Sequence, residues 1–166
     1  MNKALVAYFS ATGVTARLAA TLCKAAQADL FEIKPAQPYT AADLDWRDAQ
    51  SRSSLEMKDA SARPAIAARV EDMARYDVVF VGFPIWWYQA PRIVETFLEA
   101  YDFSGKTVVP FATSGGSGMG RTGEILAALT GETVNWVEGE RFSPSATAKE
   151  MAAWLTQKGL LPYANE

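Results

Sequence analysis

The chain has 166 residues, of which 49% are hydrophobic and 21% are charged, and its formal net charge is −3. This composition is typical of one folded domain with a sizeable core, so we treat residues 1–166 as a single domain. The 16 lysines and arginines form no basic run, and this argues against nucleic acid as the main partner.

Histidine is absent and Cys23 is the only cysteine. Catalysis by a Ser-His-Asp or Cys-His set is therefore excluded, and no acidic cluster has the spacing of a metal site, so we predict neither catalytic side chains nor a metal. Within its helical pattern, Cys23 fits a small buried hydrophobe better than a redox thiol. The apolar start is too short for a signal peptide or a membrane span, and we expect a cytoplasmic protein without membrane insertion.

Three short apolar runs predict buried strands, at Ala4 to Phe9, Val78 to Phe83, and Thr107 to Ala112. Because these runs are apolar on both faces, they favour parallel strands that are covered by helices on both sides. Weaker strands are predicted from Asp29 to Ile33 and within residues 133–142.

Apolar residues at helical spacing lie between and after these strands, in residues 14–26, 64–74, 92–101, 122–129 and 147–158. This alternation predicts an α/β fold with a doubly wound, five-stranded parallel sheet and helices on both faces. The least regular stretch, residues 35–62, is interpreted as a solvated loop with a short helix, and the alternative is a lid over a ligand.

Open sheets of this kind bind ligands at the carboxyl ends of their strands, so the loops there deserve comparison. The loop after the first strand holds the hydroxyls of Ser10, Thr12 and Thr15, and Gly13 allows a ligand to approach its backbone. With a helix N-terminus beside it, this loop predicts a site for a phosphate monoester, and plain N-capping is the alternative. The Gly-Lys-Ser/Thr of a P-loop is absent, so the phosphate would be held and not transferred.

The loop after the second strong strand runs from Pro84 to Pro91 and holds three consecutive aromatic residues, Trp86, Trp87 and Tyr88. Neighbouring side chains cannot all face one core, so at least one ring should be exposed at the sheet edge. An exposed ring there could stack on a flat heteroaromatic ligand. Packing of all three rings between helix and sheet is the alternative.

The loop after the third strong strand contains four glycines within residues 113–120. It predicts backbone amides close to a ligand, with a flexible surface loop as the alternative. Residues 118–123 also spell the dinucleotide-binding pattern G-x-G-x-x-G. Because only one weak strand follows, no complete βαβ half remains downstream, and we discount this match.

Together the three loops fit the phosphate, the ribityl chain and the flat ring of flavin mononucleotide (FMN). With this combination of loops, the chain resembles the flavodoxin-like FMN proteins, in the branch whose second loop begins Pro-Ile-Trp-Trp. The resemblance is carried by SATGVT at 10–15, YDVVFVGFPIWW at 76–87, FLEAYDFSGKTVVPFATSGGSG at 97–118 and VEGERF at 137–142.

The resemblance implies the strand order 2-1-3-4-5 and FMN as the cofactor. It also implies that Trp86 or Trp87 flanks the flavin ring. The residues that it places at FMN are Ser10, Thr12, Gly13, Val14 and Thr15 at the phosphate, Pro84, Ile85, Trp86, Trp87 and Tyr88 in the aromatic loop, and Thr113, Ser114, Gly115, Gly116, Ser117 and Gly118 at the polar edge of the flavin.

The function that the resemblance implies is electron transfer with a redox partner protein. The alternative is an FMN-dependent NAD(P)H:quinone-type oxidoreductase, whose partners are NAD(P)H and a small acceptor. Arg92 and Arg121 would then meet a nicotinamide nucleotide phosphate, although solvated surface charges are favoured for both. An adaptor without flavin is a third class, and it would require the three loops to be coincidental.

Overall fold

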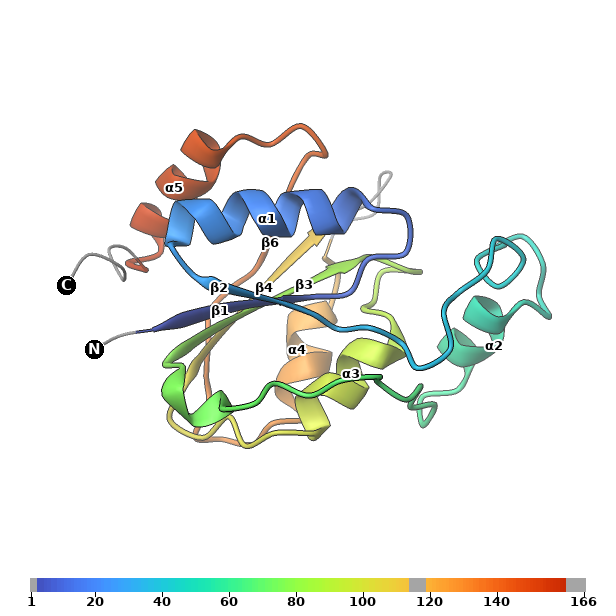
Figure 1. Ribbon diagram of the computed structural model, residues 1–166. Helices are drawn as coiled ribbons and strands as arrows, with labels where there is room; N and C mark the ends of the chain where they lie inside the picture. Colours follow the sequence, from blue (N-terminus) through green and yellow to red (C-terminus); the bar gives the residue numbers. More distant parts are fainter. Residues whose placement is uncertain (1–2, 114–118, 161–166) are drawn as a thin grey trace.

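The computed structural model describes residues 3–113 and 119–160, which form a parallel sheet between two layers of helices (Figure 1). The predicted α/β fold is confirmed. In chain order the elements are β1 (Ala4–Tyr8), α1 (Val14–Ala26), β2 (Asp29–Glu32), α2 (Arg52–Lys58), the 3-10 helix η1 (Met73–Arg75), β3 (Val78–Pro84), α3 (Arg92–Glu99), β4 (Thr107–Thr113), α4 (Thr122–Ala127), β5 (Asn135–Trp136), β6 (Glu140–Arg141) and α5 (Ala148–Gln157).

The strands lie in the order β2-β1-β3-β4-β5, and every pair is parallel. This order confirms the one that the family resemblance implied. The three central strands β1, β3 and β4 are buried along nearly their whole length, whereas the edge strand β2 alternates between half-buried and exposed residues. Burial on both faces explains why the central strands are apolar throughout.

Two helices cover each face of the sheet, α1 and α5 on one side and α3 and α4 on the other (Figure 1). On the first face, Leu18 and Leu155 belong to a buried cluster with Val6. On the second face, Phe97 belongs to a separate buried cluster with Val79. None of the helices in the described residues is both long and apolar enough to cross a membrane.

The helix predicted over residues 64–74 is wrong. This segment is irregular, with a single bridge residue at Ile66, and only its last residues enter the short 3-10 helix η1. Ile66 forms an antiparallel bridge with Pro35, and the N–H of Ala67 donates to the Lys34 carbonyl at 2.7 Å. The backbone therefore bonds to a distant segment, while Ile66 and Val70 still pack against the core as the helical spacing suggested.

The weak strand predicted within residues 133–142 is split into β5 and β6, which both pair with β4. The carbonyls of Val108 and Ala112 accept hydrogen bonds from this edge, so Pro110, which lies between them, faces the same way. Proline has no N–H to donate, and the ladder is interrupted beside it.

Residues 35–62 contain the short helix α2, as predicted, and Figure 1 places it beyond the edge where the central strands end. The helix begins after Ser51, whose side chain accepts a hydrogen bond from the Ser54 N–H. This capping bond satisfies one of the free donors at the start of a helix that has only two turns. The segment is therefore structured where it passes near the carboxyl ends of the strands.

The pairing of β3 with β4 sets Gly82 against Phe111, and a Cβ at Gly82 would lie 2.2 Å from a carbon of the Phe111 ring. We predict that Gly82→Ala lowers the free energy of unfolding by about 1–3 kcal/mol through overpacking. Gly123→Ala is the control, because its Cβ would meet nothing within 4 Å and lies in α4. Urea denaturation of both variants checks this, and equal effects would contradict it.

Candidate functional site

The loop between β1 and α1 presents uncapped backbone donors. Gly13 is the N-cap residue of α1, no side chain caps the helix, and no acidic residue lies in its first turn. Gly13 has a φ of 95°, a left-handed conformation that glycine adopts without strain, and its N–H donates to the Ser10 hydroxyl at 3.1 Å. Plain N-capping by Ser or Thr, the alternative that the sequence left open, is not what the structure shows. The helix N-terminus is thus open to an anion.

The remaining phosphate-loop residues differ in exposure. Thr12 is exposed, Ser10 and Val14 are half-buried, and Thr15 is buried. The Thr15 hydroxyl lies 2.8 Å from the hydroxyl of Thr113 at the end of β4, so the first and third loops meet there. One hydroxyl of this pair must donate to the other, which leaves the second one free to donate elsewhere.

Most of the predicted third loop lies outside the described residues. Thr113 is buried at the end of β4, and Ile85 donates its N–H to the Thr113 carbonyl at 2.8 Å. The second and third loops therefore start side by side. The other members of the predicted set, Ser114, Gly115, Gly116, Ser117 and Gly118, lie outside the described residues.

The aromatic loop closes as a tight turn. Trp86 and Gln89 exchange backbone hydrogen bonds of 2.8 and 3.0 Å, and the two residues between them, Trp87 and Tyr88, have φ angles of 49° and 64°. This is the backbone of a two-residue turn that usually carries Asn-Gly, and non-glycine residues there store roughly 1–3 kcal/mol each. Trp87 is 43% exposed and Tyr88 is 62% exposed, so the expectation of an exposed ring is met.

Trp86 behaves differently from its neighbour. Its ring packs edge-on against Phe9 and Tyr39, with centroids 5.8 and 5.7 Å away, and Phe9 and Tyr39 also contact each other. Edge-to-face packing of this kind adds about 0.5–1.5 kcal/mol per pair to the burial itself. Trp86 therefore packs between the turn and the core, whereas the exposed part of Trp87 can contact a ligand. Pro84 is half-buried and Ile85 buried, beneath the same turn.

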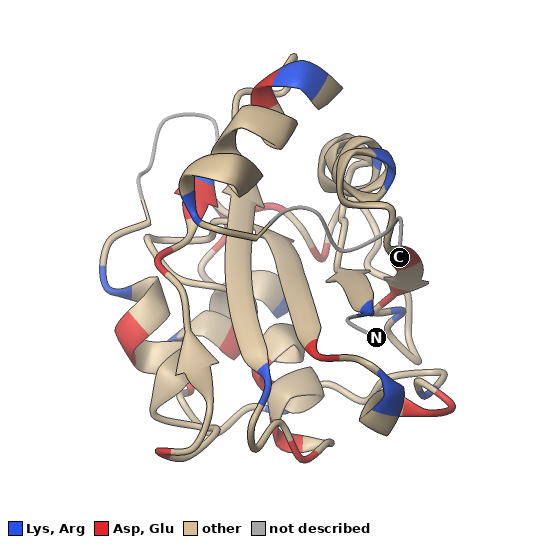
Figure 2. Ribbon diagram, turned by 90° about the vertical axis from the view of Figure 1, so that its left-hand side faces the viewer, with Lys and Arg blue, Asp and Glu red and all other residues tan. Residues whose placement is uncertain are grey.

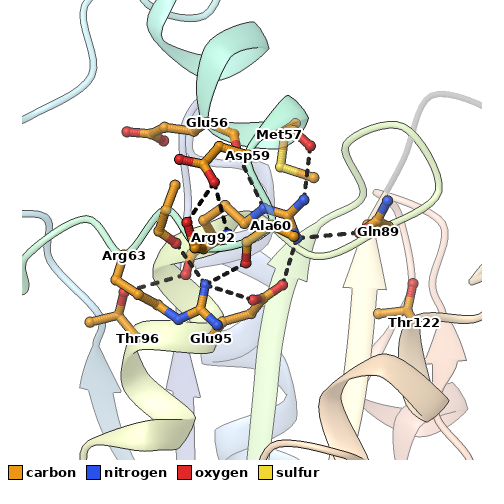
Figure 3. Close-up of polar contacts among 12 residues, drawn as sticks. Glu56, Met57, Asp59, Ala60, Arg63, Gln89, Arg92, Glu95, Thr96 and Thr122 are labelled. Atoms are coloured by element: carbon orange, nitrogen blue, oxygen red, sulfur yellow. Dashed lines mark hydrogen bonds and ion pairs between the residues drawn. The ribbon is translucent and has the colours of Figure 1, made fainter.

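Arg92 and Glu95 form a buried ion pair at the start of α3 (Figure 3). Their exposed fractions are 5% and 3%, and Arg92 Nη1 lies 2.8 Å from Glu95 Oε1. Arg63 contacts the other oxygen of Glu95 at 3.0 Å. Burying a charge is costly unless the charge is paired and hydrogen-bonded. Here side chains and carbonyls of the protein pair with both buried groups.

The same guanidinium joins three segments. It donates to the carbonyls of Glu56 and Met57 in α2, at 3.2 and 2.8 Å, and to the side-chain oxygen of Gln89 in the aromatic turn, at 3.4 Å (Figure 3). Both sequence interpretations of Arg92, a surface charge and a contact for a nicotinamide phosphate, are wrong, because its donors are buried and occupied. Arg121 is a surface charge, 81% exposed and paired with Glu124.

Tyr39 contacts α2 as well, at Glu56 and Arg52. Its hydroxyl donates to Glu56 at 2.5 Å, and Arg52 lies over its ring at 3.8 Å. Burial, followed by the neighbouring Glu56 carboxylate, raises the pKa of Tyr39, so the phenol stays protonated as a donor. Neither Tyr39 nor the role of Arg92 was predicted from the sequence, because the bonds that join them to α2 span 17 residues for Tyr39 and about 35 for Arg92.

Cys23 is half-buried, and its thiol donates to the Ala28 carbonyl at 2.7 Å. Burial raises the pKa of the Cys23 thiol, which disfavours the reactive thiolate. This favours the inert interpretation of the residue. Among the described residues, no group of three or more His, Cys, Asp or Glu side chains could hold a metal ion.

Comparison with known proteins gives a consistent result. The family model described as Flavodoxin matches residues 3–158. A search of curated proteins found no match. Among solved structures, a protein described as a flavoprotein from Bacteroides eggerthii is 52% identical, with a TM-score of 0.90 over 96% of this chain and 99% of that chain.

Two further structures extend the comparison. A protein described as a flavoprotein from Bacteroides uniformis is 47% identical, with a TM-score of 0.88 over 93% of this chain and 98% of that chain. A flavoprotein from Lactobacillus acidophilus, solved in complex with FMN, shares the fold at 21% identity, with a TM-score of 0.68 over 85% of this chain and 93% of that chain.

The buried ion pair leads to a stability prediction. Arg92→Leu should lower the free energy of unfolding by about 3–5 kcal/mol, because it leaves the buried Glu95 with one cationic partner fewer and frees three acceptors. Arg121→Leu removes an ion pair of the same spacing whose two side chains are 81% and 70% exposed, and should change stability by less than about 1 kcal/mol. Urea denaturation of the two variants checks the contrast, and similar losses would show that the buried network contributes little.

Proposed function

The chain belongs to the flavodoxin family, and we propose that it binds FMN at the carboxyl-end edge of its sheet and carries electrons between redox partners. The observation that carries the proposal is the pairing of two features at neighbouring strand ends. The uncapped start of α1 lies among hydroxyls after β1, and the exposed Trp87 ring follows β3. The FMN complex of the Lactobacillus acidophilus flavoprotein, which has the same fold, supports this choice of cofactor.

The residues present fit the group. Ser10, Thr12 and Thr15 offer neutral donors, and neither their loop nor the first turn of α1 carries a carboxylate that would repel a phosphate. The backbone N–H groups of Gly13 and Val14 would complete the phosphate site. When bound, FMN supplies the redox chemistry through its flavin ring.

The remaining residues would hold and shield the ring. Trp87 is the ring that we propose stacks on the flavin, and Tyr88 extends the same exposed surface. The turn would be held at its position above the sheet by the packing of Pro84, Ile85 and Trp86. Thr113 would be the first residue at the polar edge of the flavin. The backbone of residues 114–118 remains part of the proposed site.

A second candidate is an FMN-dependent NAD(P)H:quinone-type oxidoreductase. A protein carrier is steered to its partner by a strong field of one sign, but this chain has a net charge of only −3, and acidic and basic residues intermingle over the ribbon (Figure 2). A cleft that opens beside Trp87 also favours a small substrate. Arg92 is not available to a nicotinamide phosphate in either case.

Rapid anaerobic mixing of FMN-loaded protein with NADPH, and separately with NADH, distinguishes the two candidates. Bleaching of the flavin absorbance within the time of a catalytic turnover identifies an oxidoreductase. Reduction by dithionite or a partner reductase, with no bleaching by either nucleotide, identifies a carrier. Failure of the purified protein to bind FMN would reject both.

The phosphate loop yields a prediction for affinity. Thr12→Val should weaken FMN binding by about 1–3 kcal/mol, or roughly five- to 150-fold in Kd, because the phosphate loses a donor. Thr21→Val is the control, since the Thr21 hydroxyl donates within α1 to the Arg17 carbonyl. Flavin fluorescence titration measures both constants. Unchanged affinity in Thr12→Val would remove this residue from the site.

Substitution of Trp87 should mainly change FMN affinity, and substitution of Trp86 should mainly change the free energy of unfolding. Trp87→Ala should weaken FMN binding by about 1–3 kcal/mol and leave the free energy of unfolding nearly unchanged, because its ring is exposed. Trp86→Ala should instead lower that free energy by about 3 kcal/mol, because it opens a hole beside Phe9 and Tyr39. Flavin titration and urea denaturation of each variant give the two readouts. A larger flavin effect for a folded Trp86 variant would reverse the assignment.

A further inference from the structure

A cleft of about 300 Å³ opens between the α2 segment and the aromatic turn. One wall comes from Trp46, Arg47, Met57 and Lys58, and the other from Trp87 and Gln89. The two walls are far apart in sequence and meet only in the folded chain. None of the residues assigned to the FMN phosphate lines this cleft.

Two indole rings in the cleft are unusually open to solvent. Trp46 is 69% exposed and Trp87 is 43% exposed, although large aromatic side chains usually bury most of their area. The two rings come from opposite walls, and Met57 of α2 adds a polarisable thioether to the lining. A flat aromatic molecule in the cleft would cover this exposed apolar surface.

The charges that line the cleft are both positive, Arg47 and Lys58. Asp45 lies 3.6 Å from Arg47 and offsets part of its charge. Lys58 donates to the Ala49 carbonyl at 3.2 Å, and no carboxylate of the described residues forms an ion pair with it. Glu56, the one acidic residue within its helix, is engaged with Arg52, and the adjacent Asp59 accepts hydrogen bonds from Ser61. The cleft therefore favours a negatively charged ligand.

One side chain bonds to both walls. The Arg92 guanidinium donates to the Met57 carbonyl of one wall and to the Gln89 side chain of the other (Figure 3). Because this guanidinium is buried and tied to Glu95, the separation of the walls is fixed before any ligand arrives. A preformed cleft loses less entropy on binding than one that must be ordered by its ligand.

We propose that this cleft is a second binding site, which takes a planar aromatic molecule with a negative charge. The indoles and Met57 would contact the ring system, and Arg47 and Lys58 would attract the anionic group. The cleft shares Trp87 with the proposed flavin site, so its occupant would lie beside the flavin. That the cleft would hold a small electron acceptor rests on the proposed function, whereas the binding of a planar aromatic anion does not.

The test uses naphthalene-2-sulfonate, a planar anion that the flavin does not reduce. It is titrated into isotope-labelled full-length protein, with and without FMN, while NMR follows the indole N–H signals, assigned through Trp→Phe variants. We expect the Trp46 and Trp87 signals to shift, and the buried Trp154 signal to stay unchanged. We expect 2-naphthol, which is uncharged at neutral pH, to bind more weakly.

Charge variants sharpen the test. Lys58→Gln and Arg47→Gln should each raise the Kd of the sulfonate about three- to fivefold, and the double variant about tenfold, as expected for partly exposed charges. Arg121→Gln is the control, because it removes an exposed charge that does not line the cleft. Equal binding of both probes, or no effect of the Lys58 and Arg47 changes, would overturn the proposal.

Titration with FMN separates this inference from the proposed function. If FMN displaces naphthalene-2-sulfonate, the cleft is part of the flavin site and the second site does not exist. Absence of any shift at Trp46 and Trp87 also rejects it. If the sulfonate binds as described but FMN does not bind at all, the cleft is supported and the proposed function fails.

Discussion

Parallel pairing of the central strands is the constraint from which the site follows. The registers of β1, β3 and β4 set Tyr8 beside Gly82, and Pro84 beside Thr113, so the three strands end at one edge. The chain must then turn three times at that edge, once into each following helix. The hydroxyl contact between Thr15 and Thr113 and the bond from Ile85 to Thr113 show how closely the turns meet. Residues about a hundred positions apart thus share one site without any local motif that joins them.

A buried charge extends this site beyond the sheet. Taking the guanidinium of Arg92 out of water costs several kcal/mol, and an apolar residue in its place would avoid that cost. What an apolar residue could not do is donate in several directions at once, to α2, to Gln89 and to Glu95. Residues 35–62 have little regular structure and only one short helix. Their position next to the aromatic turn therefore depends on Arg92 and on the Tyr39 hydrogen bond to Glu56.

The sequence was informative where a local pattern governs the structure, and uninformative where distant partners do. Apolar runs and helical spacing identified the central strands and α1, and the hydroxyl-rich loop and the exposed aromatic turn were predicted from their composition. The helical spacing of residues 64–74 misled, because Ile66 and Val70 reach the core from an irregular backbone that bonds to Lys34 and Pro35. Arg92 misled for the related reason that a charge is normally exposed, and its burial depends on bonds to Glu56 and Met57 in a segment about 35 residues away. Both errors concern hydrogen bonds between segments more than thirty residues apart.

The aromatic turn lowers the stability of the fold at this edge of the sheet. Asn-Gly would adopt the same backbone with little strain, whereas Trp87 and Tyr88 are held at positive φ and leave apolar rings in water. Two contacts from outside support this conformation: the Thr122 hydroxyl, which the Met119 carbonyl shares with the Tyr88 carbonyl, and Arg92 through Gln89. The positions of the exposed rings are consequently set by the core and by the buried ion pair, and not by the preference of the turn itself. Rings fixed in this way lose little freedom when a flat ligand covers them, so binding on either side of Trp87 can draw on the apolar surface that folding leaves exposed.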